Sequence, residues 1–214
     1  MKKLLIATSN PAKLAEIRLF LSDLPLVCVG LDDVGIVGRA EESGKTFEEN
    51  AVIKAKFYAK LSSLPTIADD GGFEIDALDG APGVKSHRWI HGQRDDSDEE
   101  LILYTIKQMR GLPRARRGAQ LRLVLAYVDT AGHVYTSEAR IRGIVAQKPS
   151  PRRTPGFPYR TLLFLPEINK FYDHTVLTPE ETDRLDHRKK AVEAIKPVLK
   201  RTRNSSLETV TVPE

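Results

Sequence analysis

The segment ADDGGFEIDALDGAPGV, residues 68–84, constrains this chain more than any other part of its sequence. Two adjacent carboxylates, Asp69 and Asp70, follow a short apolar run and precede two glycines. Neighbouring side chains of a strand point to opposite faces, so we expect one carboxylate to face a site and the other to support it. The glycines would let a ligand or metal come close, and they would also permit a turn. A solvated turn is the competing interpretation, because Asp and Gly are common turn residues.

Length and composition indicate a soluble globular protein. The chain has 214 residues, which is enough for one large domain or for two lobes that share a cleft. We predict a single domain over residues 1–201 and a disordered tail over residues 202–214, whose sequence is polar and aperiodic. No apolar run reaches the roughly 20 residues that span a bilayer. Cys28 is the only cysteine, which excludes an intrachain disulfide and fits a reducing cytoplasm.

Apolar periodicity and capping residues predict a mixture of strands and helices. Asn10-Pro11 is a typical helix start, and Thr46 followed by Glu49 forms the pattern of a capping box. Two alternating runs on either side of the sequence Thr-Ala-Gly at 130–132 predict a hairpin. We expect strands at 4–8 and 26–30 and before the Asp pair, and helices after 10, after 46, over 95–109 and within 177–201. This order predicts a mixed α/β fold.

The polar segment TSNPAK, residues 8–13, is a candidate anion site. It lies between a predicted strand and a predicted helix, and the free N–H groups at a helix N-terminus attract phosphate. Thr8, Ser9 and Asn10 add hydroxyl and amide groups, and Lys13 adds a positive charge. The segment lacks the spacing of a P-loop. The competing interpretation is an ordinary capped helix with Lys13 in solvent.

Several carboxylates could hold a hard metal ion. Oxygen ligands suit Mg²⁺, especially when phosphate oxygens and water complete the coordination shell. For Glu48 and Glu49 the competing interpretation is a favourable charge in the first turn of a helix, and Glu49 could serve both purposes. No His and Cys residues have the spacing of a zinc site. The acidic candidates are Glu42, Glu48, Glu49, Asp69 and Asp70.

Aromatic and basic residues near the C-terminal end could recognise a base. Phe157 and Tyr159 lie on a loop rich in Pro and Gly, which could hold a ring for stacking. His187-Arg188 follow later, and an arginine can donate two hydrogen bonds to a purine edge. The competing interpretation is that Phe157 packs in the core and that His187-Arg188 begin a helix.

Taken together, these segments resemble the inosine/xanthosine triphosphate pyrophosphatase family. The matching segments are ATSNPAKLAEI, TFEENAVIKA, ADDGGFEIDALDGAPGVKS, GFPY and HRKKA, which span nearly the whole chain in the family's order. The resemblance implies an elongated α/β fold, in which a long, twisted mixed sheet flanked by helices forms two lobes with the active-site cleft between them. It also implies a homodimer in the cytoplasm that hydrolyses nucleoside triphosphates to monophosphate and pyrophosphate with Mg²⁺.

The resemblance also implies roles for individual residues. Glu42 and Asp70 would bind the metal, and Asp70 would also orient or deprotonate the attacking water. Glu49 and Lys54 would line the reaction centre with Asp70. The remaining positions would bind substrate: Thr8, Ser9, Asn10, Lys13 and Gly71 at the phosphates, Phe157 and Tyr159 around the base, and His187 and Arg188 at its 6-keto edge.

The chain departs from the family pattern at the end of the site that would bind the base and phosphates. Gly71 replaces a serine whose hydroxyl would contact phosphate, and Pro158 replaces a glycine. Arg160 stands where the family has an aspartate, so the charge is reversed. Thr182 replaces a lysine, and Asp186 replaces a serine. A guanidinium offers only donors, which predicts a lower preference for 6-keto purines than is usual in the family.

Two other functional classes compete with this interpretation. The altered base loop is also compatible with a catalytically weak nucleotide-binding or regulatory relative. The basic segments RGLPRARRG and KPSPRR could contact nucleic acid. However, runs of charge are usually solvated faces, and no aromatic residues are interleaved with these. We therefore expect a nucleoside triphosphate as partner, and neither nucleic acid nor a membrane.

Overall fold

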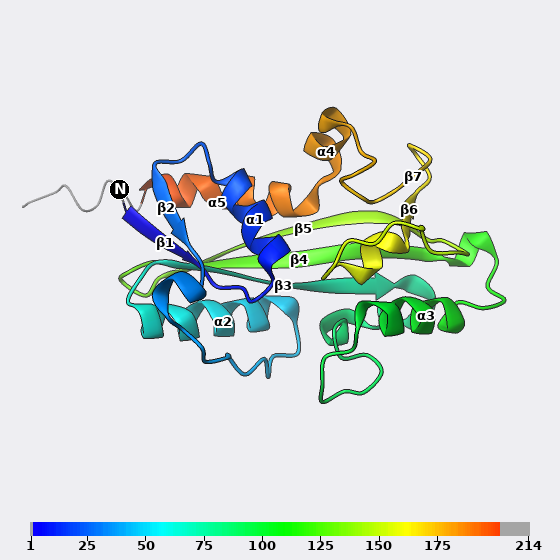
Figure 1. Ribbon diagram of the computed structural model, residues 1–214, viewed down its shortest axis with the longest axis horizontal. Coiled ribbons are helices and arrows are strands. Elements are labelled where there is room, and N and C mark those ends of the chain that lie inside the picture. The colour runs from blue at the N-terminus through cyan, green and yellow to red at the C-terminus, as the bar shows by residue number, and fades with distance from the viewer. Residues whose placement is uncertain (1, 202–214) are drawn as a thin grey trace, which may run out of the picture.

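The computed structural model describes residues 2–201, and its centre is one seven-stranded sheet (Figure 1). The predicted tail, residues 202–214, lies outside the described residues. The strands follow one another across the sheet in the order β2-β1-β3-β4-β5-β6-β7. Their bounds are β1 Lys2–Ile6, β2 Leu26–Val29, β3 Thr66–Ile75, β4 Gly118–Val128, β5 Val134–Val145, β6 Leu163–Leu165 and β7 Lys170–Phe171.

The pairing of neighbouring strands changes once across the sheet, from parallel to antiparallel. β1 is parallel to both β2 and β3, whereas every later neighbour, from β3·β4 to β6·β7, is antiparallel. The hairpin of β4 and β5 pairs from Gly118↔Ile144 to Val128↔Val134 and gives the molecule its long axis (Figure 1). The sheet is therefore mixed and elongated, which confirms the predicted fold class.

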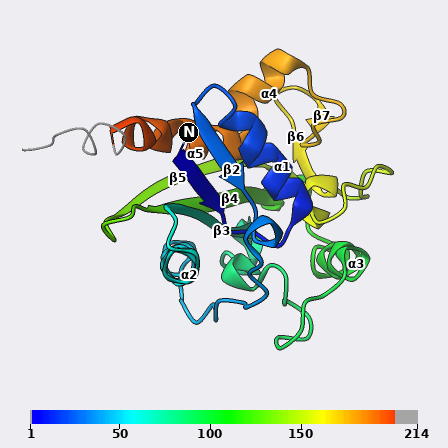
Figure 2. The ribbon, with the colours of Figure 1, turned by 60° about the vertical axis from the view of Figure 1, so that its left-hand side comes forward.

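Helices cover both faces of the sheet. α2 and α3 lie on one face, and α1, α4 and α5 lie on the other, as two views agree (Figures 1 and 2). One apolar cluster packs α2 against the sheet around Leu5, Ala51 and Val124, and another packs α1 and α5 around Ile17 and Ile195. The helix bounds are α1 Pro11–Phe20, α2 Phe47–Ser62, α3 Asp98–Gln108, α4 Pro179–Leu185 and α5 His187–Arg201.

Capping residues fix where the helices begin. The Asn10 side chain accepts hydrogen bonds from the backbone N–H groups of Ala12 and Lys13 at the start of α1. Complete capping boxes begin α2 at Thr46, α3 at Ser97 and α4 at Thr178. Each cap satisfies backbone donors that the first turn leaves free. The helix starts predicted at Asn10 and Thr46 are confirmed.

The competing prediction of a turn at Asp-Asp-Gly-Gly is wrong. β3 runs through Asp69, Asp70, Gly71 and Gly72, and β4 pairs with every one of these residues. The two glycines permit close packing rather than a reversal of the chain. A Cβ on Gly72 would lie 2.1 Å from Ser86 Oγ, and one on Gly71 would lie 2.6 Å from the carbonyl oxygen of Arg122.

Two short elements had no counterpart in the sequence prediction. β6 and β7 extend the sheet beyond β5 within a segment that lacks a clear period. Among the described residues, no helix is both long and apolar enough to cross a bilayer.

Candidate active site

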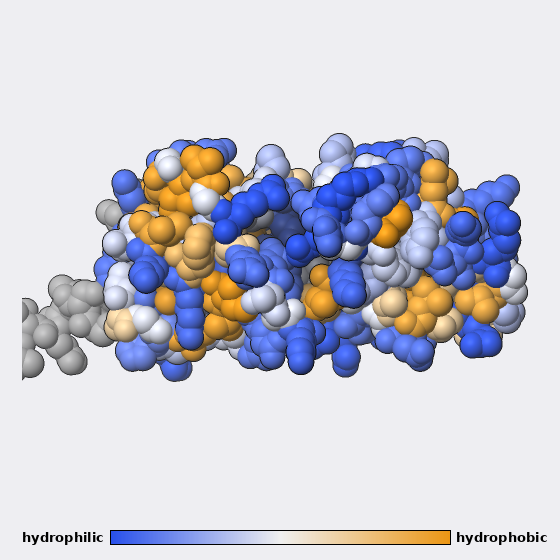
Figure 3. All heavy atoms as spheres, turned by 90° about the horizontal axis from the view of Figure 1, so that it is seen from below, coloured by the Kyte–Doolittle hydropathy of each residue, from blue (hydrophilic) through white to orange (hydrophobic). Residues whose placement is uncertain are grey.

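A large cavity opens at the edge of β3, at the point where β1 ends. β1 pairs with β3 only through Leu5↔Thr66 and Ile6↔Ile67, so the next residues of β3 have no strand on that side. The cavity measures about 780 Å³, and the surface is hollowed between the two halves of the molecule (Figure 3). Its walls include Thr8, Ser9, Asn10, Lys13, Glu42, Lys54, Asp69, Asp70, Gly71, His87, Arg88 and Gly156.

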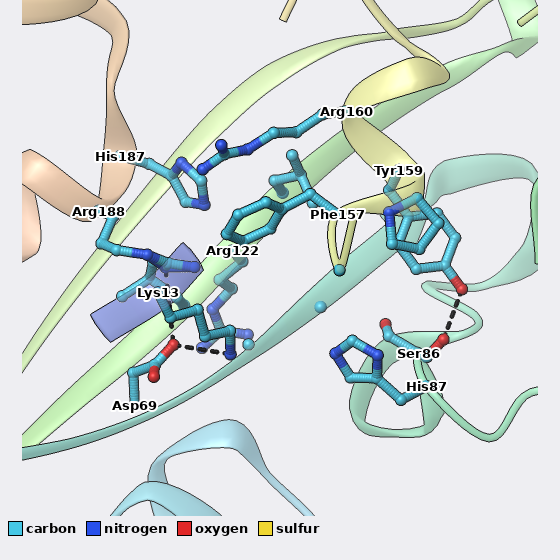
Figure 4. A pocket seen from close by; sticks show the side chains of 16 residues that line it. Lys13, Asp69, Ser86, His87, Arg122, Phe157, Tyr159, Arg160, His187 and Arg188 are labelled. Atoms are coloured by element: carbon cyan, nitrogen blue, oxygen red, sulfur yellow. Dashed lines mark hydrogen bonds and ion pairs between the residues drawn. The ribbon is translucent and has the colours of Figure 1, made fainter. Parts of the chain in front are cut away.

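A narrower recess of about 50 Å³ adjoins this cavity (Figure 4). Lys13, Asp69, Gly71, His87 and Gly156 line both spaces and therefore form the junction between them. Beyond the junction, the recess is lined by aromatic and basic side chains, which include Phe157, Tyr159, Arg160, His187 and Arg188. The two spaces together offer one polar and one aromatic compartment.

Lys54 joins two carboxylates in the large cavity. Its Nζ lies 3.0 Å from Asp70 Oδ1 and 3.3 Å from Glu42 Oε1. Arg88 also reaches Glu42, with 3.2 Å between its NH2 and Glu42 Oε2. Burial raises the pKa of Asp70; Lys54 opposes this shift and the nearby charge of Glu42 adds to it. The two carboxylates are thus close enough to repel each other, and a cation between them relieves that repulsion.

Asp69 faces the opposite helix layer from Asp70, as strand alternation predicts. Its Oδ2 lies 3.0 Å from Lys13 Nζ of α1 and 3.6 Å from Arg188 NH1 of α5. Burial alone would raise the pKa of Asp69, but the charges of Lys13 and then Arg188 lower it well below the usual range. Asp69 is therefore an anion that fixes two basic side chains at the junction.

Glu49 does not line either cavity. Its carboxylate accepts hydrogen bonds from the backbone N–H groups of Lys45, at 2.6 Å, and Thr46, at 3.2 Å, and so completes the capping box of α2. Two roles were considered for Glu49, and the structure shows the capping role. Its catalytic role stays a prediction that would require the carboxylate to leave the cap.

The predicted phosphate loop borders the cavity, but its polar groups also bond to one another. The backbone N–H of Asn10 donates to Thr8 Oγ1 at 3.2 Å. Asn10 Nδ2 donates to the carbonyl of Gly156 at 3.3 Å, which ties this loop to the aromatic loop. The Asn10 side chain thus sets the spacing of the two loops across the junction.

The two predicted base-stacking rings occupy different surroundings. Tyr159 stacks on Phe73 with 4.8 Å between ring centroids, and its hydroxyl donates to the carbonyl of Ser86 at 2.7 Å. It therefore belongs to the core and only borders the recess. Phe157 has the Arg160 guanidinium over its ring, 3.7 Å from the centroid, and the Arg188 guanidinium at 5.6 Å.

Glu16 of α1 binds both of these arginines. Arg160 donates from NH1 to Glu16 Oε1 at 2.7 Å and from NH2 to Oε2 at 3.1 Å, and Arg188 Nε donates to Oε2 at 3.1 Å. Both arginines are buried, with 4% of each residue exposed. The charge reversal at Arg160 is thus balanced by a carboxylate 144 positions away in the sequence.

His187 and Asp186 are also buried beside the recess. His187 Nδ1 lies 2.8 Å from the Tyr172 hydroxyl, and burial, followed by the charge of Arg188, keeps its pKa well below the usual range. Asp186 Oδ2 lies 3.1 Å from His174 Nε2, and Asp186 Oδ1 accepts from the backbone N–H of Lys189 at the start of α5. The residue that replaces the family serine therefore caps this helix.

The structure brings together all the predicted site residues except Glu48 and Glu49, and it adds others. Glu48 instead accepts a hydrogen bond from the Thr136 hydroxyl at 3.2 Å. Glu16, His87 and Arg88 were not identified from the sequence. Glu16 lies one turn after Lys13 in the predicted helix, and His87-Arg88 directly follow the matched segment ending GVKS. Within residues 2–201 no three or more His, Cys, Asp or Glu side chains form a group that could hold a metal ion by themselves.

Comparisons with known proteins all lead to one family. The model of the Ham1 family matches residues 4–198. The dITP/XTP pyrophosphatase of Geobacter sulfurreducens is 37% identical over 196 residues, covering 92% of this chain and 96% of that protein. The Escherichia coli protein of the same name is 35% identical over 197 residues, covering 91% and 96%. The structure of a HAM1 protein from Coxiella burnetii has a TM-score of 0.79 and 32% identity, covering 94% of this chain and all of that one.

Proposed function

Because this chain belongs to the Ham1 family, we propose that it hydrolyses dITP, ITP or XTP to the nucleoside monophosphate and pyrophosphate. The relatives' names, dITP/XTP pyrophosphatase, support this substrate class. The observation that carries the proposal is the pair of carboxylates, Glu42 and Asp70, in a polar cavity that continues into an aromatic recess. The two compartments fit the two ends of a nucleotide.

The nucleotide would bind with its base in the recess and its phosphates in the large cavity. Phe157 and the guanidinium of Arg188 would meet the base, and the loop of residues 8–13 would meet the phosphates at the positive end of α1. The α-phosphate would then lie near the junction that Lys13 and Asp69 border. This placement brings the bond to be broken close to Asp70.

Hydrolysis requires an attack by water on the α-phosphorus. The water oxygen forms the new P–O bond, the bond to the β-phosphate oxygen breaks, and pyrophosphate leaves with that oxygen. Asp70 would orient the water and accept its proton, and Lys54 would hold the Asp70 carboxylate in position. The protein contributes mainly position and charge stabilisation, which is the usual basis of phosphoryl-transfer catalysis.

The residues present fit a divalent cation, which we propose is Mg²⁺. Glu42 and Asp70 offer only oxygen ligands and already share one positive charge, that of Lys54. The protein would supply only two carboxylates to the coordination shell. This number suits Mg²⁺, because this ion keeps several water ligands and binds substrate phosphates. When bound, the ion would neutralise phosphate charge. Asp70 and Glu42 would hold it.

A panel of nucleotides tests the proposal. Purified protein with Mg²⁺ should release pyrophosphate from dITP, ITP and XTP faster than from ATP, dATP or pyrimidine nucleotides. Nucleotide binding without pyrophosphate release would instead identify the weak regulatory relative considered above. The homodimer and the cytoplasmic location remain predictions, and sedimentation and cell fractionation test them.

A further inference from the structure

The imidazole of His87 lies at the junction of the two compartments. It lines both the large cavity and the aromatic recess, together with Lys13, Asp69, Gly71 and Gly156. His87 follows Ser86, whose hydroxyl is fixed by donating to the carbonyl of Gly83 at 2.6 Å. Figure 4 shows the ring pointing into the pocket, on the opposite side from Lys13 and Asp69. The backbone beside His87 is therefore anchored while its side chain faces the space that a ligand would fill.

The other four residues at the junction either pair with each other or have no side chain. Lys13 and Asp69 form an ion pair with 3.0 Å between Nζ and Oδ2. Gly71 and Gly156 have no side chain. Within residues 2–201, the ring nitrogens of His87 make no hydrogen bond with the protein, and the residue is exposed to the cavity. His87 is thus the junction residue whose hydrogen-bonding groups are available to a ligand.

We propose that His87 donates a hydrogen bond to the α-phosphate of the bound nucleotide. The inference rests on the proposed function, which places the base in the recess and the β- and γ-phosphates in the large cavity. The group that must cross the junction is then the α-phosphate with its ribose link. An imidazole carries at least one N–H donor, and a phosphate oxygen is the acceptor that gives a charge-assisted bond.

The charges around His87 agree with this role. Enclosure in the cleft and then the positive charge of Lys13 lower the pKa of His87, whereas Asp95 raises it; Lys54 lowers it and Glu42 raises it. The imidazole is therefore neutral near pH 7 and offers one N–H group. A neutral donor of this kind adds no positive charge to the crowded group of Lys13 and Lys54 before the nucleotide arrives.

The affinities of three substrate fragments distinguish a contact with the α-phosphate from contacts with the rest of the substrate. IMP carries the α-phosphate and the base, inosine carries only the nucleoside, and pyrophosphate represents the β- and γ-phosphates. We expect His87→Ala to weaken IMP binding about tenfold, which is the effect of one lost hydrogen bond to a charged group. Pyrophosphate binding should stay within about twofold, because no contact at the β- and γ-phosphates is removed. Calorimetry with each ligand measures these affinities.

Two further variants give the experiment its controls. His87→Gln keeps an N–H donor and should recover most of the IMP affinity. His133→Ala removes an imidazole in the β4–β5 turn, where it pairs with Asp129 at 3.0 Å, and should change neither affinity. Thermal unfolding of all variants should be within a few degrees of the wild type.

The outcomes separate the inference from the proposed function. Unchanged IMP affinity in His87→Ala, or an equal loss for IMP and pyrophosphate, would overturn the contact with the α-phosphate. An equal loss for IMP and inosine would place the contact on the nucleoside and would also overturn it. If the wild-type protein binds neither IMP nor ITP and releases no pyrophosphate, the proposed function itself fails.

Discussion

The guanidinium of Arg160 lies 3.7 Å from the centroid of the Phe157 ring, so a cation already covers one face of the ring that would stack on a base. The same guanidinium donates to both oxygens of Glu16. A buried guanidinium held in this way supports the ring and has its two amino groups directed at a carboxylate. These contacts predict that Arg160 sets the position of Phe157, whereas its donor groups alone predict an effect on the preference for 6-keto purines.

Replacement of Arg160 distinguishes these two roles. We expect Arg160→Met to lower kcat/KM for ITP and ATP together, because Phe157 loses its support. The ratio of the two values should change less than about threefold, since loss of a charged hydrogen bond to the base, at about 1.5 kcal/mol or more, would change it at least tenfold. Arg152→Met removes an exposed guanidinium from the same loop and serves as control. A tenfold change in the ratio would show that Arg160 reads the base.

Replacement of Asp70 tests the catalytic end of the cavity. Asp70→Asn should reduce the rate of pyrophosphate release at least about a hundredfold, because a carboxylate that accepts a proton contributes that much or more. The fold should persist, because burial already disfavours the charged form of Asp70. Asp76→Asn is the matched control, since Asp76 is half-exposed and pairs with Arg142 instead. Near-normal turnover in Asp70→Asn would contradict the assignment.

Removal of divalent ions tests the role of Glu42 and Asp70. In excess chelator, pyrophosphate release should stop, and addition of Mg²⁺ or Mn²⁺ should restore it, because the available ligands are oxygens. The melting temperature should hardly change, because Lys54 pairs with both carboxylates without an added ion. Full activity in chelator would exclude the proposed ion.

Acid should weaken the ion pair of Asp69. The pKa of Asp69 in the folded protein is below its ordinary value of 3.8, so the anion stabilises the fold, and this contribution is complete above that value. It is lost as the pH falls from 3.8 toward the folded pKa. We expect Asp69→Asn to cost about 3 kcal/mol in the free energy of unfolding at pH 7, because it breaks a buried pair. Denaturant titrations at pH 7, 5, 4 and 3 should show this difference shrinking only at the lowest values. If the difference in unfolding free energy does not depend on pH, it arises from packing and not from the ion pair.

Gly71 is required by the approach of β4. A Cβ there would lie 2.6 Å from the Arg122 carbonyl oxygen and from Leu123 Cβ. Gly71→Ser, which restores the residue usual in the family, should therefore lower the free energy of unfolding by about 1–3 kcal/mol, as expected for overpacking. Gly38→Ser, whose Cβ would meet only Phe57 at 3.8 Å, is the control and should have little effect. Equal stability of the two variants would show that β4 can move away.

The features that could be predicted from the sequence are those that depend on residues close together in the chain. Asn10 and Thr46 bond to backbone groups two or three positions away, so their patterns were sufficient to place the helix starts. Asp69 and Asp70 were recognised as site candidates because an apolar strand followed by carboxylates and glycines can deliver those carboxylates to a cleft, and the family resemblance assigned a role to Asp70. Their alternation toward α1 and α2 follows from strand geometry.

Contacts between residues far apart in the chain could not be predicted from such local patterns. Gly71 and Gly72 were compatible with a turn as well as with a strand, and only the complete pairing of β3 with β4 shows that the strand continues. The partner of Arg160 is Glu16, and nothing near either residue signals the other. The capping role of Glu49 was predicted. Its absence from the cavity walls, however, depends on where α2 packs against the sheet.

Lys54 bears on the order in which the ion and the nucleotide would bind if Glu42 and Asp70 hold the proposed ion. Its ammonium group pairs with both Glu42 and Asp70, so a free divalent ion would meet a positive charge at the proposed binding place. A nucleotide that already carries its ion brings excess negative charge and can enter without this repulsion. We therefore expect the protein to accept the ion–nucleotide complex in one step, so that its rate follows the chelated fraction of the nucleotide pool more closely than the total.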